Sequence, residues 1–124
     1  MPMFPVALSH VPSGWYWGQS TADSCTVTCA SQGRTCNAAS VTKMLAVNSA
    51  ALMQATVPLA LNTLPAGVPS CSGGFQDGAG WLSEPFLYTA NNVCYSSDGL
   101  GATCDAVSTQ QDPGVLSYRL CYCS

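Results

Sequence analysis

Eight cysteines carry the clearest chemistry in this 124-residue chain, and four of them have short, regular spacings. Cys25 and Cys29 are four residues apart, so on a helix they share one face, about one turn apart, and one turn rises about 5.4 Å. Cys121 and Cys123 are two residues apart, so on a strand they share one face, about 6–7 Å apart. Because the two spacings match, we predict that Cys25 and Cys29 form disulfides with Cys121 and Cys123.

The other four cysteines have no such regular spacing: Cys36, Cys71, Cys94 and Cys104. We predict the bridges Cys36–Cys71 and Cys94–Cys104, although eight cysteines allow 105 connectivities. A zinc site would need a second short Cys knuckle or histidines, and the only histidine is His10. We therefore expect structural bridges, an oxidising compartment such as the cell exterior, and neither a metal nor another cofactor.

The ionisable residues are too few and too dispersed to suggest catalysis. The acids are Asp23, Asp77, Glu84, Asp98, Asp105 and Asp112. Asp beside Gly is common in turns, as at Asp77 and Asp98, and Asp23 precedes an expected helix as a cap. Asp98 and Asp105 lack the dense oxygen-ligand spacing of a calcium loop, which favours a solvated turn. We expect that the protein is not an enzyme.

Aromatic residues provide the main candidate for ligand binding. Trp15, Tyr16, Trp17 and Trp81 could form a platform for sugar rings, as in a lectin-like module. In a small domain, tryptophans more often pack in the core beside disulfides, and we prefer that interpretation.

The composition excludes nucleic acid as a partner. Only 7% of residues are charged, against about 25% in ordinary domains, and Arg34, Lys43 and Arg119 are too few to follow a phosphate backbone. With 48% apolar residues, the surface is expected to be covered by subunits, a larger parent chain or glycans. Asn92-Val-Cys94 is only an unusual variant of an N-glycosylation site, but residues 65–72 and 107–113 could carry O-linked sugars.

The pattern of helix caps and turns predicts a small α+β fold. A helix is expected over residues 24–32, with N-cap candidates from Thr21 to Ser24 and a stop at Gly33. A second is expected from a cap at Ser40, and a third from a cap at Asn48 or Ser49 to about residue 56. The second helix carries Val41, Met44 and Leu45, and in the third Leu52 and Met53 are expected to point inward. Residues 15–17 and 114–123 alternate as strands, and residues 98–101 form a turn. We expect two or three short helices on a short antiparallel sheet, with long loops held by four disulfides.

Residues 1–13 are expected to form an extended arm before a single domain of residues 14–124. The arm has three prolines and no glycine. Its apolar residues Met3, Phe4, Val6 and Leu8 could either cover its own domain as a strand or cap or add to the sheet edge of a neighbouring subunit. A basic leader is not visible, so we expect that a signal peptide has been removed or that the chain is part of a larger protein. Residues 44–76 carry no charge, but polar residues and prolines argue against a membrane span.

Two segments together resemble a known cysteine-rich pattern. They are Gly18-Gln-Ser-Thr-Ala-Asp-Ser-Cys25, continuing to Cys29, Gly33 and Cys36, and Tyr118-Arg-Leu-Cys121-Tyr-Cys123. They look like the C-terminal region of N-acetylglucosaminyltransferase V and free-standing secreted modules of algae and protists, in which Cys71, Cys94 and Cys104 would match further cysteines. The resemblance implies a recurring extracellular module without the transferase's catalytic domain.

These observations predict a non-catalytic extracellular structural module, a self-associating subunit of a surface layer, matrix or filament. Its expected partners are copies of itself or other matrix proteins. The alternative is a carbohydrate-binding module that uses exposed tryptophans. Neither interpretation involves nucleic acid or a membrane span.

Overall fold

The last strand lies inside a five-stranded mixed sheet in the order β1-β5-β3-β4-β2. The computed structural model describes residues 11–107 and 116–124. The strands are β1 (Gly14–Trp17), β2 (Phe75–Gln76), β3 (Phe86–Tyr88), β4 (Cys94–Tyr95) and β5 (Ser117–Cys123). The helices are α2 (Cys25–Ser31), α3 (Ala38–Ala46), α4 (Ala50–Thr56) and the 3-10 turn η1 (Val57–Leu59). The predicted small α+β class is confirmed.

The sheet is mixed rather than purely antiparallel as expected. β5 pairs antiparallel with β1 and β3, and β3 pairs antiparallel with β4, but β2 runs parallel to β4. Parallel partners need a crossover connection, and here residues 77–93, which include β3, provide it. The parallel pair was missed because two-residue strands leave no periodic pattern in the sequence.

The helix ends agree with the predicted caps, except at Asp23 and Ser40. Ser24 caps α2, and Ser49 caps α4, each accepting a hydrogen bond from a backbone N–H three residues ahead. Gly33 follows α2 with φ +68°, the left-handed conformation that glycine adopts most readily. The predicted cap of the second helix was wrong: Asn37 caps α3, and Ser40 completes a capping box from inside the helix.

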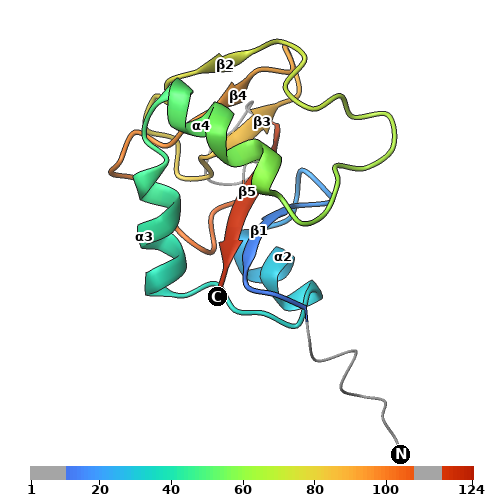
Figure 1. The fold of residues 1–124 in the computed structure, drawn as a ribbon, viewed down its shortest axis with the longest axis vertical. Helices are drawn as coiled ribbons and strands as arrows, with labels where there is room; N and C mark the ends of the chain where they lie inside the picture. The colour runs from blue at the N-terminus through green and yellow to red at the C-terminus, as the bar shows by residue number, and fades with distance from the viewer. Residues whose placement is uncertain (1–10, 108–115) are drawn as a thin grey trace, which may run out of the picture.

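Two hydrophobic clusters form on residues that alternate along β5. Cys121 and Cys123 pack with Tyr16, Cys25 and Met44 in one cluster. The second cluster is formed by Leu120 with Trp17, Val47, Met53, Cys71, Leu87 and Cys94. Because successive strand residues point to opposite faces, β5 contributes to both clusters. Figure 1 shows α2 and α3 flanking β5, and α4 near β2.

The predicted bridges between α2 and β5 are confirmed. Cys25–Cys121 and Cys29–Cys123 join Cα atoms 5.4 and 5.2 Å apart. The distance between the two cysteines along the helix therefore matches the distance between the two cysteines along the strand, as predicted. The two bridges link residues 96 and 94 positions apart in the chain.

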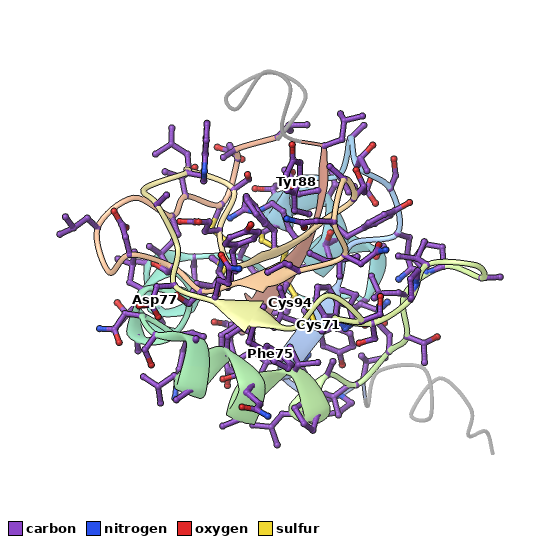
Figure 2. The ribbon with its side chains drawn as sticks, turned by 90° about the horizontal axis from the view of Figure 1, so that it is seen from above. Cys71, Phe75, Asp77, Tyr88 and Cys94 are labelled. Carbon is purple, nitrogen blue, oxygen red and sulfur yellow. A yellow bond between two sulfur atoms is a disulfide. The ribbon has the colours of Figure 1, made fainter. Side chains whose placement is uncertain are left out.

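The other two predicted bridges are wrong, because the partners are exchanged. The bonds are Cys36–Cys104 and Cys71–Cys94. Cys71 leads into β2, whose pairing with β4 brings it beside Cys94, as Figure 2 shows. Cys104 lies near α2, where its carbonyl accepts a hydrogen bond from the Thr26 N–H, and from there it reaches Cys36. The four disulfides indicate an oxidising compartment.

Candidate functional site

A cavity of about 260 Å³ opens beside β3 and β4 and is lined mainly by aromatic rings. We call it the aromatic pocket, and its lining residues are Ala79, Trp81, Phe86, Tyr88 and Tyr95. Phe86 is buried, Tyr88 and Tyr95 are half-buried, and Trp81 is 37% exposed. The pocket therefore has a buried ring and three rings that reach the surface.

The antiparallel pairing of β3 with β4 positions three of the rings. Phe86 and Tyr88 are two residues apart and share one face of β3, while Leu87 faces the second core cluster. Phe86 lies opposite Tyr95 in the register. Figure 2 shows Phe75 between β2 and α4, with Tyr88 on the other side of the sheet. The pocket thus lies on the face turned away from α4.

The rings are inclined to one another rather than stacked. The Phe86 and Tyr95 centroids are 5.7 Å apart with an interplanar angle of 74°. Tyr88 and Tyr95 are 6.4 Å apart at 59°. Edge-to-face pairs of this kind are favourable because the ring edge is positive and the ring face negative. The inclination makes the surface concave.

The fourth ring is held by a loop that is anchored on a buried carboxylate. Glu84 is 1% exposed, and its carboxylate accepts hydrogen bonds from the backbone N–H groups of Ala79 at 3.0 Å and Trp81 at 3.2 Å. A Cβ at Gly78 would lie 1.9 Å from the Ser96 carbonyl oxygen and 2.6 Å from both Glu84 carboxylate oxygens. Glycine is thus required for the loop to approach β4.

Burial raises the pKa of Glu84 from 4.5 to about 7. Desolvation is the main cause, and the charge of Asp98 raises the pKa further. The hydrogen bonds from the backbone of Ala79, Trp81 and Gly80 act in the opposite direction, because they stabilise the carboxylate. The loop beside the pocket is therefore attached to a group that titrates near neutral pH.

The structure does not assemble the predicted tryptophan platform. Tyr16 and Trp17 are each 3% exposed, so neither has a ring face available to a ligand. Trp15 packs edge-on against Tyr122 at 5.3 Å, and β1 is separated from β3 by β5. Trp81 alone of the four lines the aromatic pocket. As the sequence favoured, the first three belong mainly to the core.

The pocket residues missed from the sequence are Phe86, Tyr88, Tyr95 and the anchor Glu84. The alternation of Phe86-Leu-Tyr88 was the available signal, but it is too short to separate a strand from a loop. The sequence likewise carried no signal that Arg119, one of three basic residues, has a structural role. It is buried, and its guanidinium donates to the carbonyls of Ser83 at 3.1 Å and Ala106 at 2.9 Å.

Most of the acids considered for chemistry hold local structure. Asp77 accepts a hydrogen bond from the Ala50 N–H, Asp98 accepts from Leu100 and Gly101, and Asp105 accepts from the Thr26 hydroxyl. Asp23 accepts from the Gln19 N–H, so the helix cap predicted there is Ser24 instead. Asp112 lies outside the described residues.

Within residues 11–107 and 116–124, no group of three or more His, Cys, Asp or Glu side chains could hold a metal ion. No helix in this part of the chain is long and apolar enough to cross a membrane.

A second surface feature is a run of exposed leucines after the start of α4. We call Leu52, Leu59 and Leu61 the leucine segment; they are 45%, 60% and 51% exposed. The prediction that Leu52 points inward was wrong, whereas Met53 is fully buried as expected. The inward side of α4 is filled by Met53 and Thr56, which leaves Leu52 at the surface.

Leu61, the last residue of the leucine segment, and the following Asn62 lie beside the outer edge of β1. The Leu61 N–H donates to the Trp15 carbonyl at 2.8 Å, and the Asn62 side chain bonds both the N–H and the carbonyl of Trp17. A Cβ on Gly14 would lie 2.8 Å from Leu61 Cδ1. Leu61 and Asn62 therefore cover the free edge of β1.

Part of the expected arm contacts the domain. The Val11 carbonyl accepts hydrogen bonds from the Arg34 guanidinium, and the Pro12 carbonyl accepts from the Tyr16 hydroxyl at 2.6 Å. Met3, Phe4, Val6 and Leu8 lie outside the described residues. The chain thus enters β1 through two anchored residues, next to Leu61.

Comparisons with protein-family models, with curated proteins and with solved structures found no match for this chain.

Proposed function

We propose that this chain is a non-catalytic extracellular structural module that associates with copies of itself in a surface layer, matrix or filament. The observation that carries the proposal is the exposed leucine segment beside the first strand. Exposed apolar surface on a small domain commonly marks a contact with another protein. Leu61 of this segment lies against Gly14, at the start of β1.

The charge distribution supports this surface as a protein contact. Residues 44–76 carry no charged side chain, so a partner can cover them without desolvating an ion. A contact between the leucine segment of one copy and the arm of the next joins two different surfaces. Such a head-to-tail contact generates a ring or an open filament.

The four disulfides stabilise the fold in the way expected of an extracellular structural module. Two long-range bridges hold α2 against β5, and two more hold the loops. Each native bridge typically adds about 2–4 kcal/mol to the free energy of unfolding. The resemblance to the cysteine-rich region of N-acetylglucosaminyltransferase V belongs to the same proposal, since it implies a module that recurs in extracellular proteins.

The test is the size of the full chain by light scattering, with electron microscopy of the same non-reduced sample. The double variant Leu52→Lys/Leu59→Lys places charges on the leucine segment, and deletion of residues 1–10 removes the arm. Leu100→Lys is the matched control, because Leu100 is 86% exposed in the turn at residues 98–101. Circular dichroism verifies folding.

We expect polymers or a defined oligomer for the unmodified chain and for Leu100→Lys, and monomers for the other two variants. A monomeric unmodified chain at every concentration would overturn the proposal. If the leucine double variant assembled as well as the Leu100→Lys control, the leucine segment would not be the contact surface.

A further inference from the structure

The aromatic pocket lies on a different face from the leucine segment and is not used by the proposed self-association. We propose that it binds one uncharged pyranose ring whose ring hydroxyls are all equatorial, as in a β-glucoside. The inference goes beyond the proposed function, because it assigns a ligand to a site that assembly does not need. Three properties of the lining support it.

The first property is electrical neutrality. The pocket's lining includes no Asp, Glu, Lys, Arg or His; it consists of Ala79, Trp81, Phe86, Tyr88 and Tyr95. Glu84 and Asp98 lie behind the loop, where they bond to backbone N–H groups. Arg119 pairs with Phe86 in the sheet register and points its guanidinium at carbonyls. The nearby charges are of both signs and already have partners, which favours an uncharged ligand.

The second property is the inclination of the rings. A pyranose with equatorial hydroxyls presents axial C–H groups on both of its faces. These hydrogens are weakly positive and interact favourably with the negative faces of aromatic rings. The Tyr88 and Tyr95 rings, which are inclined at 59°, can contact more than one side of such a ring. An axial hydroxyl would place a polar group against one wall.

The third property is the position of polar atoms at the tyrosines. The Tyr95 hydroxyl oxygen accepts a hydrogen bond from the Asn91 side-chain N–H at 3.1 Å. A phenol both donates and accepts, so this contact leaves the hydroxyl proton available to a ligand. Asn91 is itself fixed, because its carbonyl oxygen accepts from the Val93 N–H at 2.9 Å. A ligand with apolar faces and a hydroxyl rim matches both kinds of lining atom.

The size agrees with a single ring. Pockets for drug-sized ligands usually measure about 300–1,000 Å³, and this cavity measures about 260 Å³. A single sugar residue, such as the terminal unit of a glycan, therefore suits it better than a longer oligosaccharide.

The test is a titration of the ¹⁵N-labelled full chain with methyl β-glucoside, followed by two-dimensional NMR. We expect saturable shifts at the Trp81 indole and at the backbone of residues 79–95. Methyl β-galactoside and methyl α-mannoside, which each have one axial hydroxyl, are expected to bind about fivefold to tenfold more weakly. The same titration of Leu52→Lys/Leu59→Lys separates binding from assembly.

Three variants test the assignment to the pocket. Trp81→Ala removes an exposed wall and should abolish the shifts. Tyr95→Phe keeps the ring but removes the hydroxyl, and it should weaken binding about fivefold, the usual effect of one neutral hydrogen bond. Leu100→Ala is the control at another exposed apolar residue and should bind as the unmodified chain does.

Two outcomes would overturn the inference. One is the absence of saturable shifts with every glycoside. The other is binding that Trp81→Ala leaves unchanged, since the sugar would then lie elsewhere. A peptide of residues 1–12 is titrated in parallel, and shifts at the pocket with this peptide but with no sugar would assign the pocket to the proline-containing arm instead.

Discussion

The carboxylate of Glu84 accepts a hydrogen bond from the backbone N–H of Trp81, with 3.2 Å between the backbone nitrogen and Oε1. The contact joins a buried acid to the backbone of a residue three positions earlier, whose side chain is exposed. Through this contact and its partner at Ala79, the ionisation of one side chain is coupled to the position of a pocket wall.

Replacing Glu84 with Gln should flatten the dependence of stability on pH. The folded pKa is about 7 and the ordinary value is 4.5, so folding favours the protonated acid. Its contribution is fully present below pH 4.5 and is lost as the pH rises through 7. The expected loss is at most roughly 3 kcal/mol, measured by urea unfolding from pH 4 to pH 8.

The neighbouring acid provides a control for this measurement. Asp98 raises the pKa of Glu84 through its charge, so Asp98→Asn should move the transition to lower pH without removing it. An unchanged pH slope in Glu84→Gln would show that another group is responsible.

Replacing Gly78 with Ala should destabilise the fold and displace Trp81. The new Cβ would lie 1.9 Å from the Ser96 carbonyl oxygen, and relief of this overlap requires a backbone shift costing about 1–3 kcal/mol. Gly67→Ala is the matched control. Gly67 has φ +86° and no heavy atom within 4 Å of the added Cβ, so its cost is limited to about 1–2 kcal/mol of backbone strain. Trp fluorescence should change in Gly78→Ala and not in Gly67→Ala.

Replacing the cap of α3 should cost more than replacing the cap of α4. Asn37 accepts from the Ser40 N–H at 3.0 Å, and its side chain also accepts from the Ser124 hydroxyl. Ser49 makes one capping bond, with the Leu52 N–H at 3.2 Å. Loss of a cap typically costs about 1 kcal/mol. Thermal unfolding of Asn37→Ala and Ser49→Ala tests the order, and equal losses would contradict it.

The long-range and short-range disulfides should differ in their effect on stability. Cys25–Cys121 closes a separation of 96 residues and Cys71–Cys94 one of 23. In the loop-entropy model this difference corresponds to roughly 1 kcal/mol. We expect Cys25→Ser/Cys121→Ser to lower the unfolding free energy by that much more than Cys71→Ser/Cys94→Ser.

The connectivity itself is tested by a chymotryptic digest without reduction. Cleavage after Phe75, Tyr88 and Tyr95, with tryptic cleavage after Lys43 in the same digest, places Cys36, Cys71, Cys94 and Cys104 on four different peptides. Mass spectrometry should then find Cys71 linked to Cys94 and Cys36 linked to Cys104. A Cys71–Cys36 peptide would support the original pairing instead.

Local periodicity in the sequence determined the parts of this protein that depend on near neighbours. The spacing of Cys25 and Cys29 matched that of Cys121 and Cys123 because each pair follows the repeat of its own element. The caps at Ser24 and Ser49 and the stop at Gly33 could be predicted for the same reason, since each satisfies backbone groups within one turn.

Only the tertiary structure decided features that depend on residues distant in the chain. The parallel pairing of β2 with β4 brings Cys71 to Cys94 and leaves Cys36 for Cys104, and no local pattern records that choice. In the sequence Glu84 is one of several dispersed acids, and its burial results from the loop that contacts it in the folded structure. The aromatic pocket likewise exists only because the pairing of β3 with β4 and the anchoring of Trp81 bring together rings that have no common spacing.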